Sequence, residues 1–386
     1  MNYTSRMSLL GTESAFDVLV KARALEAKGK DVIHLEIGEP DFDTPTHIVE
    51  AGRKALADGF THYGPPAGLP DLREAIANDV AQSRNIDVNA DQVVVCPGAK
   101  PIMFFAILAL AEEGTEVVYP NPGFPIYESV IKFAGATPVP APLIEERNFT
   151  LDVEQMADLV TDKTRLIIIN SPQNPTGGII PAEDLEVIAD VAVRHNIPVL
   201  ADEIYSRMVY DGEFASISAF DGMADKLIIL DGFSKTYAMT GWRLGYGVMP
   251  EETAQRIARL MVNSNSCTAA FTQQAGIAAL TGPQEPSYAM LDEFRKRRDV
   301  FHAGLNAIDG ITCQLPGGAF YLFPNITKTG RPSQEMEEVL LQAGVASLSG
   351  TGFGSYGEGY LRFSYANSLQ NIEEALRRIE GAVSSL

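Results

Sequence analysis

Along most of the chain, short apolar runs alternate with longer stretches in which apolar residues recur at helical spacing. Many of the short runs are rich in valine and isoleucine, which favour strands. Strands that alternate with helices are typical of a parallel sheet covered on both faces. The sequence therefore predicts an α/β fold with a mostly parallel seven-stranded sheet, and its strands are expected at residues 92–96, 116–119, 137–140, 165–170, 198–201, 226–230 and 244–249.

The pattern changes after about residue 285. Residues 288–308 read as one long amphipathic helix, followed by short strands at 319–323 and 361–365 and a final helix at 369–383. We interpret this region as a smaller α+β domain. The predicted organisation is an N-terminal arm with part of the small domain (1–45), a large domain (46–285) and a small C-terminal domain (286–386).

Charge and cysteine usage narrow the class of protein. The formal charge is 30 − 50 = −20, which disfavours nucleic acid and anionic membranes as partners. Three cysteines without a CxxC spacing indicate a reducing compartment and no disulfide framework or zinc ribbon, and we expect no metal site. The N-terminus lacks the apolar core of a signal peptide, and the longest apolar run, about 102–111, is too short to span a bilayer. We expect a soluble, cytoplasmic protein.

Candidate chemistry gathers where the predicted strands end. Ligands of open parallel sheets bind beyond the carboxyl ends of the strands. Four strands end in polar, ionisable or glycine-rich residues, namely Gly98-Ala99-Lys100-Pro101, SPQNPTGG (171–178), Asp202 with Tyr205, and Ser234-Lys235. This convergence carries more weight than any one of these segments.

Each segment also has an ordinary structural interpretation. The segment 98–101 is either an anion site at a helix N-terminus or a plain strand–helix turn. Asp202 either caps a helix or holds a cationic partner such as a protonated ring nitrogen, because a carboxylate after a buried strand needs a partner. Tyr205 lies one helical turn further on and could be packing alone.

Lys235 is either a surface lysine or a nucleophile. A partly desolvated lysine has a lowered pKa and can attack a carbonyl carbon. Ser234 and Arg243 favour the second interpretation, because a hydroxyl close to a guanidinium suits a phosphate. The GxGxxG match at 352–357 is rejected as a dinucleotide fingerprint, because the residues after it read as a strand where that motif needs a helix.

With these residues in hand, the chain resembles the class I (fold-type I) pyridoxal-phosphate aminotransferases, and most closely the bacterial aspartate aminotransferase branch. The resemblance runs from about Ser14 to the C-terminus. It is carried by LEIGEPDFDTP (35–45), HYGPPAGLPDLREAI (62–76), NSPQNPTGG (170–178), ADEIY (201–205), SKTYAMTGWRLG (234–245) and LRFSYA (361–366).

The resemblance implies a role for each candidate residue. Lys235 would bind pyridoxal phosphate covalently and carry the proton, while Asp202 would pair with the ring nitrogen. Asn174 and Tyr205 would hold the phenolic oxygen of the ring, and Phe124 would stack on the ring. The phosphate would be held by Gly98, Ala99, Lys100, Ser234 and Arg243, with Tyr63 reaching it across the interface of a homodimer.

Substrate binding is implied in the same way. Arg362 would clamp the α-carboxylate, and Gly38 would lie beside it on a segment that closes over the substrate. In the thermophilic-bacterial branch, a lysine at the position of Lys100 and a serine near Ser14 contact the distal carboxylate. Residues 261–267 (MVNSNSC) contain no arginine that could bind the distal carboxylate instead.

The predicted reaction is ping-pong transamination between an L-amino acid and a 2-oxo acid. Lys100 and Ser14 favour aspartate and glutamate with 2-oxoglutarate. Phe104 and Phe105 leave alanine, aromatic amino acids, kynurenine or a broad substrate range open. Two other classes remain as alternatives: a lyase or decarboxylase that uses the same cofactor, and a non-catalytic sensor that binds it.

Overall fold

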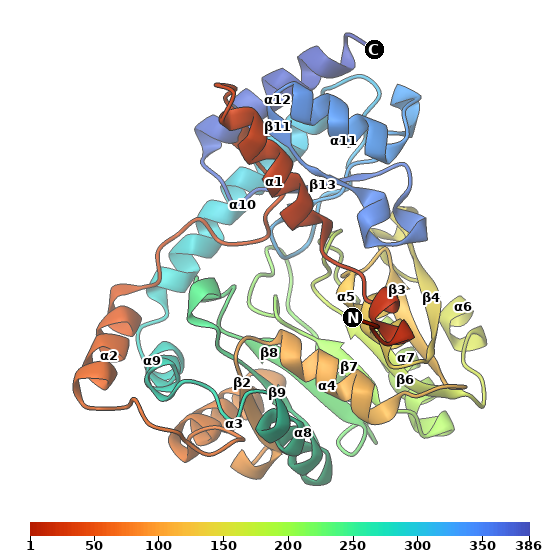
Figure 1. The fold of residues 1–386 in the computed structure, drawn as a ribbon. Helices are drawn as coiled ribbons and strands as arrows, with labels where there is room; N and C mark the ends of the chain where they lie inside the picture. The colour runs from red at the N-terminus through yellow and green to blue at the C-terminus, as the bar shows by residue number, and fades with distance from the viewer.

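The computed structural model describes residues 1–386, and its central feature is an eight-stranded sheet of order β2-β9-β8-β7-β6-β3-β4-β5 (Figure 1). The strands are β2 (Val93–Cys96), β3 (Glu116–Asn121), β4 (Thr137–Ile144), β5 (Thr150–Leu151), β6 (Thr164–Asn170), β7 (Val199–Asp202), β8 (Leu227–Gly232) and β9 (Gly245–Val248). Seven of them are the predicted strands, and the predicted α/β class is confirmed. The eighth, β5, has two residues, too few to produce an alternating pattern.

The sheet is mostly parallel, as predicted. Strands β3, β4, β6, β7 and β8 pair in parallel, whereas β9 runs antiparallel to both of its neighbours and β5 runs antiparallel to β4. Because β9 separates β2 from β8, strand β2 points in the same direction as the parallel strands. The carboxyl ends of β2, β6, β7 and β8 therefore lie at one edge of the sheet.

Helices cover both faces of the sheet. Val93 and Val95 pack into one core with α3 (Pro70–Arg84), α6 (Val153–Asp158), α7 (Ala182–His195) and α9 (Ala270–Thr281). Val94 and Cys96 pack into a second core with α4 (Lys100–Leu110), α5 (Ile126–Phe133) and α8 (Glu251–Ser264). Successive strand residues point to opposite faces, so a strand between two cores must be apolar throughout.

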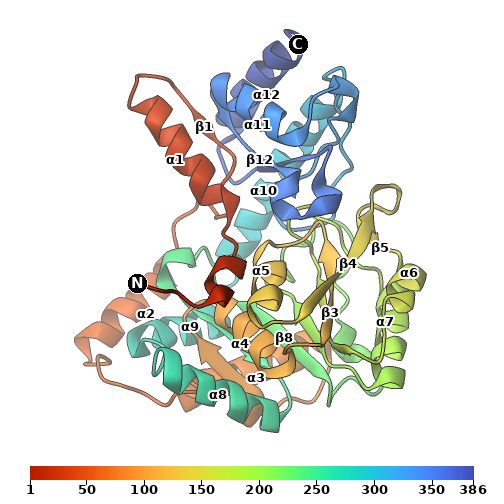
Figure 2. The ribbon, with the colours of Figure 1, turned by 45° about the vertical axis from the view of Figure 1, so that its right-hand side comes forward.

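A smaller unit lies above the carboxyl edge of the sheet in Figures 1 and 2. Its helices are α1 (Ser14–Glu26), α10 (Glu285–Asn306), α11 (Ser333–Gln342) and α12 (Leu369–Val383). Its strands are β10 (Tyr321–Leu322), β12 (Leu348–Ser349) and β13 (Leu361–Ser364), which form an antiparallel sheet, and β1 (Ile33–His34), which pairs in parallel with β11 (Val345–Ala346). The pairing of β1 with β11 joins the N-terminal segment to this unit. The domain boundaries at 45 and 285 stay a prediction.

Helix α2 (Thr46–Ala57) packs beside α9 on the flank of the large unit, and its Ile48 belongs to the same core as Ala275 and Ala279 of α9 (Figure 1). The predicted helices all form, with α10 starting three residues earlier than expected. Both predicted strands of the C-terminal region also form, although the one expected at 319–323 is limited to Tyr321–Leu322.

The glycine-rich segment 352–357 forms part of two 3₁₀ turns, Gly350–Phe353 and Ser355–Gly357, before β13 begins at Leu361. A strand therefore follows the GxGxxG match, which confirms its rejection as a dinucleotide fingerprint. Gly354 has φ +121°, and a Cβ there would lie 2.4 Å from the amide of Asn121. Only glycine satisfies both conditions.

The three cysteines are free, and Cys96 and Cys313 are buried. None of the helices combines the length and the apolar character that crossing a membrane requires.

Candidate active site

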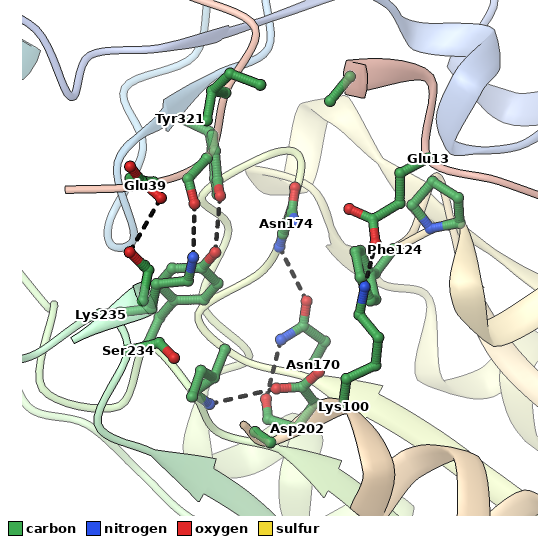
Figure 3. A pocket seen from close by; sticks show the side chains of 18 of the residues that line it. Glu13, Glu39, Lys100, Phe124, Asn170, Asn174, Asp202, Ser234, Lys235 and Tyr321 are labelled. Atoms are coloured by element: carbon green, nitrogen blue, oxygen red, sulfur yellow. Dashed lines mark hydrogen bonds and ion pairs between the residues drawn. The ribbon is translucent and has the colours of Figure 1, made fainter. Parts of the chain in front are cut away.

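A cavity of about 600 Å³ opens at the carboxyl edge of the large sheet, where the smaller unit and the N-terminal segment face it (Figure 3). Most of the residues singled out in the sequence line this cavity. They are Ser14, Gly38, Ala99, Lys100, Phe124, Asn174, Asp202, Tyr205, Ser234, Lys235, Arg243 and Arg362. The convergence predicted from the strand ends is therefore a feature of the fold.

Strand register brings the polar residues together at the floor of this cavity. Asn170, the last residue of β6, stands opposite Asp202, the last residue of β7, and Asp202 stands opposite Leu230 of β8. The side-chain amide of Asn170 donates 2.9 Å to the carbonyl of Asp202, and its oxygen accepts the backbone N–H of Asn174 at 2.9 Å. Asn170 thus ties the NSPQNPTGG loop to the strand that carries Asp202.

Asp202 is a buried carboxylate without a cationic partner. It accepts a 2.6 Å hydrogen bond from the hydroxyl of Tyr127 and a 3.3 Å bond from the backbone N–H of Ile204. Burial raises the pKa of Asp202 to about 6, against the smaller opposing effect of the Tyr127 hydrogen bond. A buried carboxylate in this condition favours a positively charged partner such as a protonated ring nitrogen.

Lys235 follows β8 and reaches into the cavity from the side. Its amine donates a 2.6 Å hydrogen bond to the carbonyl of Gly38 and lies 5.8 Å from the ring centroid of Phe320. Burial lowers the pKa of Lys235 to about 8; the carboxylate of Glu39 opposes this shift, and the charge of Arg362 adds to it. An amine that loses its proton near pH 8 can act as a nucleophile and as a base under ordinary conditions.

The turn between β2 and α4 presents unpaired backbone N–H groups to the cavity side of the sheet edge, an arrangement that suits an anion. The backbone N–H groups of Gly98, Ala99 and Lys100 make no hydrogen bond within the chain, and they lie at the start of α4, where the helix dipole is positive. Gly98 has φ +82°, and a Cβ there would lie 2.1 Å from a guanidinium nitrogen of Arg243. A phosphate at this turn would meet three amides and a guanidinium.

Arg362 is a buried cation that faces the cavity. One of its terminal nitrogens donates 3.2 Å to the side-chain oxygen of Asn174, and the other donates to the carbonyl of Glu36. Its Nε is buried and has no partner. The guanidinium carbon lies 4.5 Å from the ring centroid of Tyr321 and 5.0 Å from that of Phe353. These two aromatic rings restrict the orientation of the guanidinium group. A buried guanidinium bonded only to neutral oxygens favours a carboxylate ligand.

Tyr205 and Tyr321 meet above the cavity floor, where their hydroxyls share a 2.8 Å hydrogen bond. Burial raises the pKa of Tyr205 well above its usual value, so its hydroxyl keeps the proton that a donor needs. A Cβ on Gly38 would lie 2.2 Å from the hydroxyl oxygen of Tyr321. Gly38 is thus required for the close approach of its segment to the tyrosine pair.

Two predicted residues stand outside the lining of the cavity. Gly98 lies directly behind it and contributes through its packing against Arg243. Tyr63 lies on the loop before α3, and the residue is 91% exposed. Nothing in a single chain brings Tyr63 to the cavity.

The sequence analysis missed four residues at or near the site, namely Glu13, Tyr127, Tyr321 and Arg84. Tyr127 could have been found from its position three residues after Phe124 at the start of a helix, and Glu13 from its position beside Ser14. Tyr321 lies within the apolar run AFYLF, and Arg84 ends an amphipathic helix. Neither of these two carries a signal of its own in the sequence.

Comparison with known proteins decides the family. The family described as "Aminotransferase class I and II" matches residues 30–379 of this chain. The chain belongs to this family. Aspartate aminotransferase of Pyrococcus abyssi is 43% identical over 358 residues, which are 91% of each chain. Aromatic-amino-acid aminotransferase 2 of Thermococcus litoralis is 41% identical over 90% of this chain and 91% of its own.

The fold agrees with this assignment. A solved structure of aspartate aminotransferase from Thermus thermophilus with maleate is 35% identical, with a TM-score of 0.95 over 99% of this chain and 100% of the other. The expected resemblance to class I, fold-type I aminotransferases is therefore confirmed, and so is the assignment as a pyridoxal-phosphate-dependent aminotransferase. Because the relatives carry names with different substrates, the family does not settle the substrate of this aminotransferase.

Proposed function

We propose that this aminotransferase holds pyridoxal 5'-phosphate in the cavity and exchanges the amino group of aspartate or glutamate with 2-oxoglutarate. The observation that carries the proposal is the meeting, in one cavity, of the Lys235 amine, the Asp202 carboxylate without a cation, and the Arg362 guanidinium with its unpaired Nε. The Asp202 carboxylate lacks a cation, the Arg362 guanidinium lacks an anion, and the lone pair of the Lys235 amine lacks an electrophile.

The residues present fit the cofactor at every chemical group it carries. Asp202 would face the ring nitrogen, and Asn174 and Tyr205 the phenolic oxygen. Phe124 would lie against the ring. The amides of Gly98, Ala99 and Lys100, with Ser234 and Arg243, would hold the phosphate. When bound, the cofactor supplies an aldehyde for the amine of Lys235 and an electron sink for the carbanion formed at the substrate α-carbon.

The protein itself contributes orientation and proton transfer. Arg362 would bind the substrate α-carboxylate. Arg362 and Gly38 both lie against Tyr321, and the carbonyl of Gly38 accepts a 2.6 Å hydrogen bond from the Lys235 amine. Clamping the carboxylate fixes which bond of the α-carbon faces Lys235, and the amine then takes the α-proton. With a pKa of about 8, the amine can accept that proton and return it.

Support for an acidic substrate comes from Lys100 and from the relatives. Lys100 and Ser14 both line the cavity, and Lys100 lies on the side away from Lys235 in Figure 3. The Thermus thermophilus structure was solved with maleate, a molecule with two carboxylates. The cation of Lys100 would bind the second carboxylate while Arg362 binds the first.

An uncharged or aromatic substrate is the second candidate. Phe16, Met103, Phe124 and Phe353 give the cavity an apolar wall, and one relative is named for aromatic amino acids. Such a wall would bind an aromatic side chain by apolar contact. Lyase or decarboxylase chemistry with the same cofactor would use the same residues and would differ in turning over without a 2-oxo acid.

The test is a single-turnover titration of the purified, cofactor-loaded protein. L-aspartate, L-glutamate, L-alanine, L-phenylalanine and L-kynurenine are added separately, and the visible absorbance of the bound cofactor is followed. We expect fast loss of the band with aspartate and glutamate alone, and its return when 2-oxoglutarate is added. Fast loss with alanine or the aromatic amino acids would overturn the acidic substrate, and turnover that needs no 2-oxo acid would overturn transamination.

We expect Arg362→Lys to weaken substrate binding by about 1–3 kcal/mol, roughly 5- to 150-fold, because a lysine cannot make two parallel hydrogen bonds to a carboxylate. Affinity for the cofactor should change little. Substrate binding is measured from KM, and cofactor affinity is measured by titration with pyridoxal phosphate. Arg377→Lys, at an exposed arginine of α12, is the matched control. An equal loss of substrate and cofactor affinity would remove the clamp role.

The proposed active form is a homodimer in which Tyr63 of one subunit reaches the phosphate of the other. The exposure of Tyr63 supports this, as do exposed apolar side chains near the N-terminus, among them Tyr3, Met7, Leu9 and Phe16. We expect Tyr63→Phe to lower cofactor affinity about five- to tenfold through loss of one hydrogen bond. Co-expression of Tyr63→Phe with Lys235→Ala should then restore one normal site per hybrid dimer. A monomer in sedimentation, or no recovery in the hybrid, contradicts the shared site.

A further inference from the structure

The mouth of the cavity carries an ion pair between Glu13 and Lys100 (Figure 3). Glu13 immediately precedes α1, and Lys100 is the first residue of α4, so the pair bridges the N-terminal segment and the large unit. The amine of Lys100 also lies 5.3 Å from the ring centroid of Phe124. The Lys100 side chain is 46% exposed and that of Glu13 is 23% exposed.

Lys100 differs from the other cations of the cavity because its partner is a carboxylate. Arg362 donates to the side chain of Asn174 and to a backbone carbonyl, Lys235 donates to the carbonyl of Gly38, and Arg243 donates to the carbonyl of Thr240. These three cations have only neutral acceptors. Lys100 alone is already paired with a carboxylate, so an arriving second carboxylate meets a cation that is occupied.

We propose that Glu13 is an internal competitor for the distal carboxylate of an acidic substrate, and that it sets the preference of the enzyme between acidic and uncharged amino acids. The proposal rests on the proposed aminotransferase function. The Glu13 carboxylate neutralises Lys100 until an acidic substrate binds, and the substrate then takes its place on the amine. The Glu13 carboxylate can leave because its side chain makes no hydrogen bond or ion pair other than the one to Lys100, so turning away breaks no further polar contact.

The same pair would let an uncharged substrate bind. A side chain that enters beside Lys100 removes water from the amine, and an unpaired ammonium loses hydration energy when water is removed. With Glu13 in place, the charge is already balanced, and the apolar atoms of Met103 and Phe16 can meet the substrate. One acidic residue would thus allow two kinds of substrate at one site.

The expected size of the effect follows from the exposure of the pair. When an acidic substrate binds, the Glu13–Lys100 ion pair is broken and a pair between the substrate and Lys100 forms. Glu13 therefore lowers the apparent affinity for that substrate by the free energy of one partly exposed ion pair. Removing the charge with Glu13→Gln should raise kcat/KM for aspartate by about two- to fivefold. The value for alanine or phenylalanine should stay the same or fall by up to about twofold, because a bare amine is then left beside an apolar side chain.

Inhibitor binding to the cofactor-loaded enzyme tests the proposal without turnover. Dissociation constants for succinate, with two carboxylates, and butyrate, with one, are measured from the absorbance of the bound cofactor. Glu13→Gln should tighten succinate by about two- to fivefold and leave butyrate unchanged. Asp17→Asn, at an exposed acidic residue one turn further along α1, is the matched control and should change neither.

Lys100→Met and the double variant complete the cycle. Lys100→Met should weaken succinate binding, and Glu13→Gln should have no further effect in that background. If Lys100→Met weakens succinate but Glu13→Gln leaves it equal or weaker, the competitor role is wrong while the proposed function stands. If Lys100→Met leaves succinate binding unchanged, both the distal contact and the competitor role are wrong. Failure of the wild-type enzyme to transaminate any amino acid would instead contradict the proposed function.

Discussion

Lys235→Ala is expected to abolish transamination, with a fall in kcat of at least about 10⁴-fold. The side chain combines two functions that no neighbour can take over. Its amine is the group that we propose binds the cofactor covalently, and with a pKa of about 8 it is also the proposed base. The measurement is steady-state turnover of aspartate and 2-oxoglutarate, with covalent attachment of the cofactor read by mass spectrometry after borohydride treatment.

The matched control is Lys226→Ala. Lys226 immediately precedes β8, at the opposite end from Lys235, where its amine is exposed and bonds to Asn196 at 2.6 Å. This variant should keep full activity and full attachment. Activity of Lys235→Ala within tenfold of the wild type would refute the assignment.

The lowered pKa of Lys235 also predicts how the rate of cofactor attachment depends on pH. Only the unprotonated amine attacks an aldehyde, and burial disfavours the charged form. The rate of cofactor attachment to the cofactor-free protein should therefore rise with pH and level off above about pH 8. The rate for an exposed lysine would continue to rise until the pH reached the ordinary lysine pKa of about 10.4.

Arg84→Met is expected to lower the free energy of unfolding by about 3–5 kcal/mol. Arg84 is 5% exposed and lies at the end of α3 behind the active site. Its guanidinium donates 3.1 Å to Glu203, 2.6 Å to Asp231 and 3.2 Å to the hydroxyl of Ser206. Methionine fills much of the volume but leaves two buried carboxylates without a cation.

Urea denaturation of the cofactor-free protein measures this loss. Arg53→Met, at an exposed arginine of α2 paired with Glu50, removes a surface ion pair and should change stability by less than about 1 kcal/mol. Burial raises the pKa of Glu203, and a protonated carboxyl needs no counter-ion, so the loss in Arg84→Met should shrink as the pH falls. A loss below about 1 kcal/mol at neutral pH would show that the network does not hold this part of the fold.

The Arg84 network also bears on the active site. Asp202 and Glu203 are consecutive, and the negative charges of Glu203 and Asp231 raise the pKa of Asp202 in addition to the effect of burial. Arg84 partly balances those two charges. The cation on the far side of the sheet therefore helps Asp202 to keep the ionised form that a ring nitrogen favours.

The sheet was predictable because its strands lie between two cores. Residues of β6 alternate between the two faces, with Ile167 and Ile169 in one core and Leu166 and Ile168 in the other. A strand buried on both faces leaves a continuous apolar run that no surface element imitates at this length. Strand β5 was missed because only two residues take part in pairing, and such short segments carry no period.

The candidate site was predictable to the extent that topology alone brings residues together. Parallel strands deliver their last residues to one edge, so Asn170, Asp202 and Lys235 could be placed near one another from the chain alone. The partners of these residues could not. Tyr127 reaches Asp202 from α5, and Tyr321 reaches Tyr205 from a separate unit 116 residues further on.

The amino-acid sequence by itself determined the fold class, the order of the strands along the chain, and the residues gathered at the carboxyl edge of the sheet, because local periodicity and strand direction are properties of short segments. Only the tertiary structure decided which charges lack partners and which are already paired. Arg362 was already a candidate carboxylate clamp from the family resemblance, and the structure added that its Nε is buried without a partner, whereas Lys100 proved to be paired with Glu13. Whether a charge is satisfied depends on the distance to groups from remote parts of the chain, and spacing along the sequence does not contain that distance.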